Sequence, residues 1–321
     1  MTVPLVAWWE CYVQVPVQAG DMVSAFLHHL GSTAVVFHEP AVLSPPRESC
    51  VISMPSGAPQ VVLHAAFAAD AELAPRLARL QVYLREEAVE FASGPWHLYC
   101  RPLRDDTYLT QWRDFFQPLD IEDRLRVRPP WDYSPVPDTM SCLTLEPGMA
   151  FGTGTHPTTR LALTLVARYV PEPPRGCLLD VGCGSGILSL AALQLGIPSV
   201  LGVDVEAEAV SVARQNAALN GLQDRAEFRQ GSWELADGTY AMIVANIYLG
   251  PLVNMLHALG QRLQPHGVMI LSGILTFQEM TLRTALDTAH LRVVEQLVED
   301  NWVALAVRHQ EPRSGSSRET E

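Results

Sequence analysis

The sequence predicts an α/β protein in which a small α+β domain precedes a larger domain built on a mostly parallel sheet. From residue 178 onward, short and nearly continuous apolar runs alternate with segments of helical periodicity. This alternation is typical of parallel strands that are covered by helices on both faces. Before residue 105 the order of elements is strand, helix, strand, strand, helix, strand. A chain of 321 residues is long enough for two such domains of about 150 residues each.

The N-terminal elements are predicted from alternating apolar residues and from the turn residues between them. We expect a helix that begins at Asp21 and a longer helix over residues 71–89. Residues 40–60 are rich in Pro, Ser and Gly and predict a loop. The resulting order is typical of a ferredoxin-like domain. The expected strands are residues 8–15, 34–38, 61–67 and 96–102.

Two further segments join the domains. Residues 105–117 carry Tyr, Leu, Trp and Phe side chains at helical spacing, which predicts a stiff linker helix packed through its aromatic stripe. A Pro-rich turn follows, and residues 140–148 predict a strand. We therefore divide the chain into residues 1–104, a linker at 105–120, a second domain at 121–310 and a polar, disordered tail at 311–321.

The elements of the second domain follow in strict alternation. The helices are expected at residues 186–196, 208–221, 250–263 and 277–290. The strands are expected at residues 178–182, 199–205, 226–231, 241–247 and 267–275, and a hairpin over 292–308 supplies two more.

Composition excludes several classes of protein. Hydrophobic residues make up 48% and charged residues 18% of the chain, which is typical of a soluble globular protein. No apolar run reaches the roughly 18 residues of a membrane span, and the apolar start carries Glu10 and no basic residue, so we expect a strand there and no signal peptide. The net charge of −13 argues against direct binding of nucleic acid and is compatible with a basic protein partner.

Cysteine and lysine usage narrows the chemistry. The six cysteines are scattered without a CxxC pair, so we expect neither a zinc site nor any other metal site, no disulfide framework, and a reducing cytoplasm. All 22 basic residues other than histidine are Arg, which we attribute to codon bias. The absence of Lys rules out a lysine nucleophile, a Schiff base or a P-loop cation.

A glycine turn connects the first strand of the parallel sheet to its first helix. The run Asp180-Val181-Gly182-Cys183-Gly184-Ser185-Gly186 has the spacing G-x-G-x-G, whereas dinucleotide-binding turns have G-x-G-x-x-G. Glycines at such a turn allow close approach of a ligand, and Asp204 at the end of the next strand is placed to hold ribose hydroxyls. The combination indicates S-adenosylmethionine (AdoMet) and disfavours an ordinary cofactor-free turn.

Two more segments belong to the predicted site. Asn246 ends a strand at the edge where ligands bind in parallel sheets, although an Asn there is also a common helix cap. The run MAFGTGTHPTTR, residues 149–160, has glycines and hydroxyls but no Lys, so it is not a P-loop. Its His156 is either a site residue or only the start of a helix that Pro157 begins.

These motifs together resemble the PrmA family, which methylates large-subunit ribosomal protein eleven. The resemblance rests on LEPGMAFGTGTHPTTRLAL, LLDVGCGSGILSLAALQLG, GVDVEAEAVSVARQNAALNG, VANIYLGPL and LSGIL. It covers residues 105–305 well, and the N-terminal part matches in element order. It implies a class I AdoMet-dependent methyltransferase fold, with a Rossmann-like, seven-stranded, mostly parallel sheet behind the ferredoxin-like domain.

The resemblance implies residues for the cofactor and for catalysis. Thr159, Gly182, Asp204 and Asn246 fall where the family contacts AdoMet, and the FGTGTH loop would fold over the methionine end of the cofactor. Asn246 is also the candidate that orients the acceptor amine, and His156 is a second catalytic candidate. Further candidates near the cofactor are Phe151, Thr153, Thr155, Asp180, Gly184, Gly186 and Ser232.

The implied reaction is methylation of lysine ε-amines or the α-amine of ribosomal protein eleven. Residues 1–104 would recognise this partner, and we expect a cytoplasmic monomer that binds neither nucleic acid nor a membrane. Tyr248, where the family usually has a small aliphatic residue, motivates an alternative in which another protein's lysines are the substrate. A non-catalytic AdoMet-binding adaptor and an NAD-dependent oxidoreductase are weaker alternatives, the latter because of its glycine spacing and the missing Lys.

Overall fold

The computed structural model describes residues 8–32, 35–38, 60–86, 96–103, 117–146, 156–170 and 176–310. The chain forms two compact units, Met1–Gln117 with Pro147–Phe151, and Pro118–Glu146 with Gly152–Glu321. Residues 105–116 of the linker helix expected at 105–117 lie outside the described residues, as do residues 40–59 of the loop expected at 40–60 and the tail at 311–321. None of the described helices is long and apolar enough to cross a membrane.

The described residues of the first unit form an antiparallel sheet and two helices, in the predicted order. Its strands are β1 (Trp8–Pro16), β2 (Val35–His38), β3 (Gln60–Ala68) and β4 (His97–Leu103), and its helices are α1 (Val17–His29) and α2 (Leu73–Glu86). The sheet order is β2-β3-β1-β4. The ferredoxin-like class of this unit stays a prediction.

Helix α1 begins at Val17 and not at Asp21, so the expected start was four residues late. Pro16 ends β1, and the helix follows without an intervening turn. Proline is common immediately before or at the first position of a helix, and Gly20 and Asp21 are tolerated inside the helix because its apolar face is buried in the core. Val23 and Leu27 on that face are fully buried.

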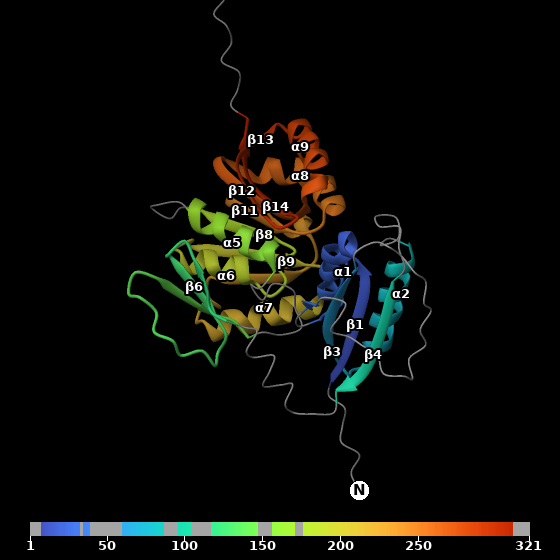
Figure 1. Ribbon diagram of the computed structural model, residues 1–321. Coiled ribbons are helices and arrows are strands. Elements are labelled where there is room, and N and C mark those ends of the chain that lie inside the picture. The colour runs from blue at the N-terminus through green and yellow to red at the C-terminus, as the bar shows by residue number, and fades with distance from the viewer. Residues whose placement is uncertain are drawn as a thin grey trace, which may run out of the picture. The chain divides into compact units, whose positions relative to one another are not determined.

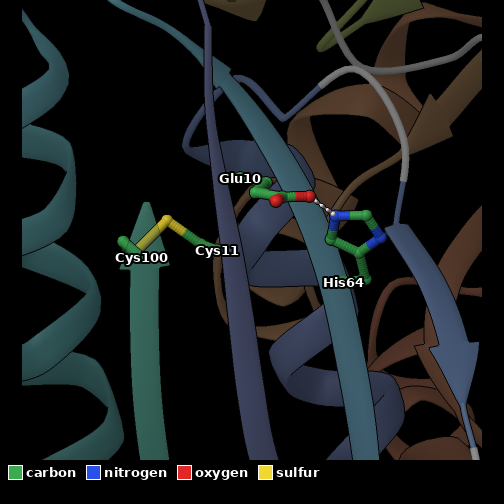
Figure 2. The surroundings of a disulfide bond; sticks show 4 residues. All are labelled: Glu10, Cys11, His64 and Cys100. Carbon is green, nitrogen blue, oxygen red and sulfur yellow. Dashed lines mark hydrogen bonds and ion pairs between the residues drawn. A yellow bond between two sulfur atoms is a disulfide. The ribbon is translucent and has the colours of Figure 1, made fainter. Parts of the chain in front are cut away.

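A disulfide joins Cys11 to Cys100, so the expectation of no disulfide was wrong. The two residues lie directly opposite each other in the antiparallel pair β1–β4, with Cα atoms 4.1 Å apart. Figure 2 shows the bond between these two strands. The cysteines are 89 positions apart in sequence, so their proximity depends on the strand order and not on any local motif.

Glu10 lies on the face of β1 opposite Cys11, because successive side chains of a strand point to opposite faces (Figure 2). This carboxylate is only 3% exposed. It accepts hydrogen bonds from Tyr12 Oη and His64 Nε2, both at 3.0 Å, and it pairs with Arg101. Burial, and then the hydrogen bond to Glu10, raise the pKa of Tyr12 to about 12. The cluster satisfies a buried charge that would otherwise cost several kcal/mol of stability.

The second unit is built on a seven-stranded sheet in the order β10-β9-β8-β11-β12-β14-β13. The strands are β8 (Cys177–Val181), β9 (Ser199–Asp204), β10 (Ala226–Gln230), β11 (Tyr240–Asn246), β12 (Leu263–Leu275), β13 (Leu291–Glu299) and β14 (Trp302–His309). Neighbouring pairs from β10 to β12 are parallel, and β14 is antiparallel to both β12 and β13. The prediction of a seven-stranded, mostly parallel sheet is confirmed.

The helices of this unit are α5 (Pro157–Tyr169), α6 (Ile187–Gln194), α7 (Ala207–Leu219), α8 (Leu249–Arg262) and α9 (Glu279–Thr288). Strand order runs in one direction from β8 to β10 and in the other from β11 to β12. Since crossovers between parallel strands are right-handed, α6 and α7 cover one face and α8 the other. Figure 1 shows α8 beside α9, and α5 beside α6.

A small sheet, β5-β6-β7, was not predicted apart from its last strand. Its strands are β5 (Leu119–Ile121), β6 (Leu125–Arg128) and β7 (Ser141–Thr144). The turn between β5 and β6 has positive φ at Glu122 (51°) and Asp123 (49°), where Asn-Gly is the usual sequence signal. The hairpin was missed because the two residues with positive φ are not an Asn-Gly pair.

Candidate functional site

The predicted cofactor residues meet at the carboxyl edge of the seven-stranded sheet. Asp180 lies in β8 and Gly182 directly after it, Asp204 ends β9, and Asn246 ends β11. Parallel strands end at one edge, so residues that are up to 66 positions apart are brought together. Strand order reverses between β8 and β11, which is the position where ligands bind in open α/β sheets.

The glycine turn has a conformation that only glycine adopts readily. Gly182, Gly184 and Gly186 have φ of 74°, 52° and 79°. A Cβ on Gly182 would lie 2.5 Å from Ile247 Cγ2, so strain and steric contact both select glycine there. Gly186 is the N-cap of α6, which leaves the first amide groups of that helix directed toward the edge of the sheet.

Asp204 is held by two backbone amides. Its Oδ2 accepts a hydrogen bond from Gly184 N at 2.9 Å, and its Oδ1 accepts one from Glu206 N at 3.0 Å. The side chain is half-buried. A carboxylate has about four lone-pair directions, so each oxygen can accept a further bond from a ligand hydroxyl. The glycine turn and Asp204, the carboxylate predicted to bind ribose, are therefore joined by a hydrogen bond.

Asp180 is fully buried, and burial raises the pKa of its carboxyl to about 7. Two hydrogen bonds from Ser189 to Oδ2 oppose this shift, one from the backbone N at 3.2 Å and one from Oγ at 2.8 Å. Its Oδ1 has no hydrogen-bond partner. The pKa of the neighbouring Cys183 thiol is raised by burial as well.

Thr159 lies in the first turn of α5 and is fully buried. Its Oγ1 is the second predicted site atom without a hydrogen-bond partner. In the described part of the chain only four buried side-chain polar atoms lack a partner, and Thr159 and Asp180 supply two of them. Buried polar groups are nearly always satisfied, so each of these two atoms is a candidate contact for a polar ligand.

His156 is the N-cap of α5, and Pro157 is its first residue. The ring Nδ1 accepts a hydrogen bond from Thr158 N at 3.3 Å and lies 2.8 Å from Thr158 Oγ1. The imidazole also meets Trp302 edge-on, with ring centroids 5.0 Å apart. These capping contacts support the interpretation that His156 starts helix α5.

Ser232 follows β10 at the same edge and is half-buried. The preceding Gly231 donates its amide to Asp204 O at 2.8 Å, so this segment borders the predicted ribose acid. Phe151, Thr153 and Thr155 lie outside the described residues. Within the described ranges, no group of three or more His, Cys, Asp or Glu side chains could hold a metal ion.

Two supporting residues were missed by the sequence analysis. Ser189, which binds Asp180, stands out as the one polar side chain before Gln194 in the apolar helix α6, and this contrast could have identified it. Asn216 is also buried, and its side chain joins Ser185 O at 2.9 Å to Glu146 N at 3.3 Å. It thereby links the glycine turn to the segment that leads into the FGTGTH loop.

The seven-stranded sheet with its antiparallel β14, and the G-x-G-x-G turn bonded to the acid after the next strand, define a Rossmann-like methyltransferase fold. The family described as ribosomal protein L11 methyltransferase (PrmA) matches residues 7–310. The chain belongs to this family, as the resemblance predicted.

Individual relatives agree with this assignment. Proteins of Geobacter metallireducens and Pelobacter propionicus, both named ribosomal protein L11 methyltransferase, are each 34% identical to this chain. The alignments cover 93% and 94% of this chain and 97% of each relative. The crystal structure of a ribosomal protein L11 methylase from Lactobacillus delbrueckii subsp. bulgaricus is 33% identical, with a TM-score of 0.57 over 61% of this chain and all of that chain.

Proposed function

We propose that this protein uses AdoMet to methylate amino groups of ribosomal protein L11, either lysine ε-amines or the α-amine. The observation that carries the proposal is the family match over residues 7–310, because it includes the glycine turn, Asp204 and Asn246. The near-complete coverage of relatives named for this activity supports the same substrate.

The residues at the sheet edge suit AdoMet. Asp204 would accept hydrogen bonds from the ribose hydroxyls, and Gly182, Gly184 and Gly186 would let the amino acid part approach the backbone closely. The unpartnered Thr159 Oγ1 and Asp180 Oδ1 fit the charged amino acid end of the cofactor. We assign Asn246 and Ser232 to the same site, with Phe151 and Thr153 as further contacts.

Bound AdoMet supplies a methyl group on a positively charged sulfur, which a neutral amine can attack. A free lysine has a pKa of about 10.4, so an acceptor lysine must lose its proton, and an apolar approach lowers its pKa by desolvation. We propose that the Asn246 side-chain oxygen accepts an N–H of the amine and so directs its lone pair, while water takes the proton. His156 would contribute indirectly, because its ring caps the helix that carries Thr159.

For the whole chain we propose a division of labour. Residues 1–104 recognise L11, residues 105–120 link the parts, residues 121–310 bind AdoMet, and residues 311–321 take no part. Because Cys11 and Cys100 form a disulfide, the scattered cysteines no longer argue for a cytoplasmic location. The cytoplasmic location that we propose rests on the ribosomal substrate, and we propose a monomer.

A different protein substrate is the second candidate, and Tyr248 favours it. This residue directly follows the Asn246-Ile247 pair, and it is 43% exposed at the edge where an acceptor must enter. A large exposed side chain at that point changes the shape that the acceptor segment must fit.

The test is intact-mass spectrometry of unmodified L11 incubated with this protein and AdoMet. We expect mass gains in steps of one methyl group, abolished by Asp204→Ala and kept by Asp224→Ala, an exposed residue in the loop before β10. No gain from a protein that binds AdoMet in calorimetry would favour the other-substrate candidate. A protein that does not bind AdoMet would overturn the proposal.

A further inference from the structure

The end of β12 touches two separate parts of the proposed cofactor site. Ser272 in this strand is fully buried. Its Oγ donates a hydrogen bond to Thr158 O at 2.9 Å, in the first turn of α5. Its own carbonyl accepts a bond from Ile247 N at 3.2 Å, and Asn246 lies opposite it in the β11–β12 register. One residue therefore contacts the neighbours of both Thr159 and Asn246.

The next residue, Gly273, allows this close approach. Its φ is 85°, and a Cβ there would lie 2.6 Å from Ile247 O and 3.0 Å from Ile247 N. On its other side, Ile247 packs against Gly182, where a Cβ would also collide with it. The segment after Asn246 is thus held between two glycines, and its distance from the glycine turn and from β12 is fixed by backbone contact.

We propose that Ser272 is a positioning residue that sets the distance between Thr159 and Asn246 for AdoMet binding. The inference rests on the proposed cofactor site. The hydroxyl of Ser272 forms a buried side-chain hydrogen bond between β12 and Thr158 in the first turn of α5, and Thr159, with its unpartnered Oγ1, is the next residue.

Loss of this hydroxyl affects position more than stability. In α-helical geometry the carbonyl of Thr158 also accepts a bond from the amide four residues later, so it keeps a partner when Ser272 is replaced by Ala. Helix α5 would remain folded and packed on β12, but its first turn would lose a hydrogen bond that fixes its position on this strand. A ligand that contacts both Thr159 and Asn246 would then bind to a less well-ordered pair of groups.

The matched control is Ser141, at the start of β7. Its Oγ donates to the backbone oxygen of Gln194 at 3.0 Å, so it makes the same kind of bond within the same unit. Gln194 ends α6, and that helix begins at the glycine turn and runs away from the carboxyl edge. Ser141→Ala therefore removes a comparable hydrogen bond at a distance from the site.

The experiment measures AdoMet affinity by calorimetry and the melting temperature of the full chain. We expect Ser272→Ala to weaken AdoMet binding about five-fold, the loss expected of one buried hydrogen bond, and Ser141→Ala to leave the affinity unchanged while lowering the melting temperature by at least as much. In a Thr159→Val background, Ser272→Ala should have little further effect, because the two residues act together.

Equal affinity losses in Ser272→Ala and Ser141→Ala, no loss in Ser272→Ala, or independent losses in the double variant would each overturn the proposal. Since the measurement uses AdoMet alone, it does not depend on L11. A wild-type protein that binds AdoMet but does not methylate L11 would contradict the substrate and leave this inference testable, whereas failure of the wild type to bind AdoMet would remove both.

Discussion

Asp180 is a carboxyl group whose charge costs free energy in the folded protein. Burial raises its pKa from 3.8 to about 7, so near neutral pH the folded chain without ligand is a mixture of the protonated and charged forms. The contribution of this group to folding stability is complete below the unfolded pKa and is lost as the pH rises through about 7. A cation that binds beside Oδ1 would favour the charged form.

AdoMet binding should therefore be pH-dependent. Its ammonium group would lower the pKa of Asp180, so binding below about pH 7 should release a proton, and affinity should increase by up to about tenfold per unit between about pH 5.5 and about pH 7. Calorimetry in buffers of different ionisation enthalpy measures the proton release. Asp180→Asn should bind with an affinity independent of pH, and a wild type with equally flat affinity would contradict this role.

Gly182 and Gly260 provide a test of backbone strain at single residues. Gly182→Ala forces a positive φ on a residue with a side chain and brings its Cβ against the stiff Ile247, so we expect a loss of about 1–3 kcal/mol in the free energy of unfolding. Gly260 lies in α8 and is followed by Gln261, and a Cβ added there would meet only ordinary contacts, the nearest being Leu291 Cδ1 at 3.7 Å, so Gly260→Ala should stabilise by about 0.5–1 kcal/mol. Urea denaturation measures both, and equal effects of the same sign would refute the explanation.

At the scale of elements, the Cys11–Cys100 bond joins the central strand β1 to the edge strand β4. Closing a chain segment of this length restricts the unfolded state, which typically stabilises a protein by about 2–4 kcal/mol. We expect Cys100→Ser to lower the free energy of unfolding of the first unit by this amount, in an oxidising buffer. Cys142→Ser, which removes a free and half-buried cysteine, should change it by less than about 1 kcal/mol.

Reducing agent provides the complementary measurement. It should lower the stability of the wild type to that of Cys100→Ser and leave Cys100→Ser unaffected. If the wild type is as stable with reductant as without it, the bond contributes nothing to folding. Alkylation before mass analysis shows directly how many thiols are free.

The elements that sequence reasoning placed well are those with strong local signals. The apolar runs of β8, β9 and β11 are buried on both faces of the sheet, so their composition alone identified them, and the glycine turn was placed together with Asp204. The hairpin β5–β6 was missed because Glu122 and Asp123 adopt a left-handed turn without its usual residues. The disulfide was missed because cysteine pairing depends on which strands become neighbours.

Some residues of the candidate site could likewise be predicted from the sequence, and others could not. Strand-end residues such as Asp204 and Asn246 could be found, since parallel strands end at one edge. Ser272 could not, because its role depends on a contact with Thr158, which is 114 positions away. Only the packing of α5 across the sheet brings these two residues together.

For the whole molecule, the two compact units should have separable tasks. We expect residues 118–321 alone to bind AdoMet with nearly the affinity of the full chain, because Asp180, Asp204 and Asn246 all lie in that unit. Its kcat/KM for L11 should fall by at least about tenfold, since the proposed recognition domain is missing. Calorimetry and methylation kinetics test the two halves of this prediction, and undiminished kinetics would remove the first unit from substrate recognition.

Strand β14 lies between β12 and β13 in the sheet although it follows both in sequence, and Trp302–Val307 are buried along its length. During synthesis, the edges of β12 and β13 that pair with β14 therefore stay unpaired until the ribosome has released the chain beyond His309. Until then the sheet that carries Asn246 and Ser272 is incomplete, so we expect a nascent chain to gain its cofactor site only after β14 has emerged. A nonsense mutation before Trp302 would yield a chain with open, aggregation-prone strand edges and not a shortened enzyme with partial activity.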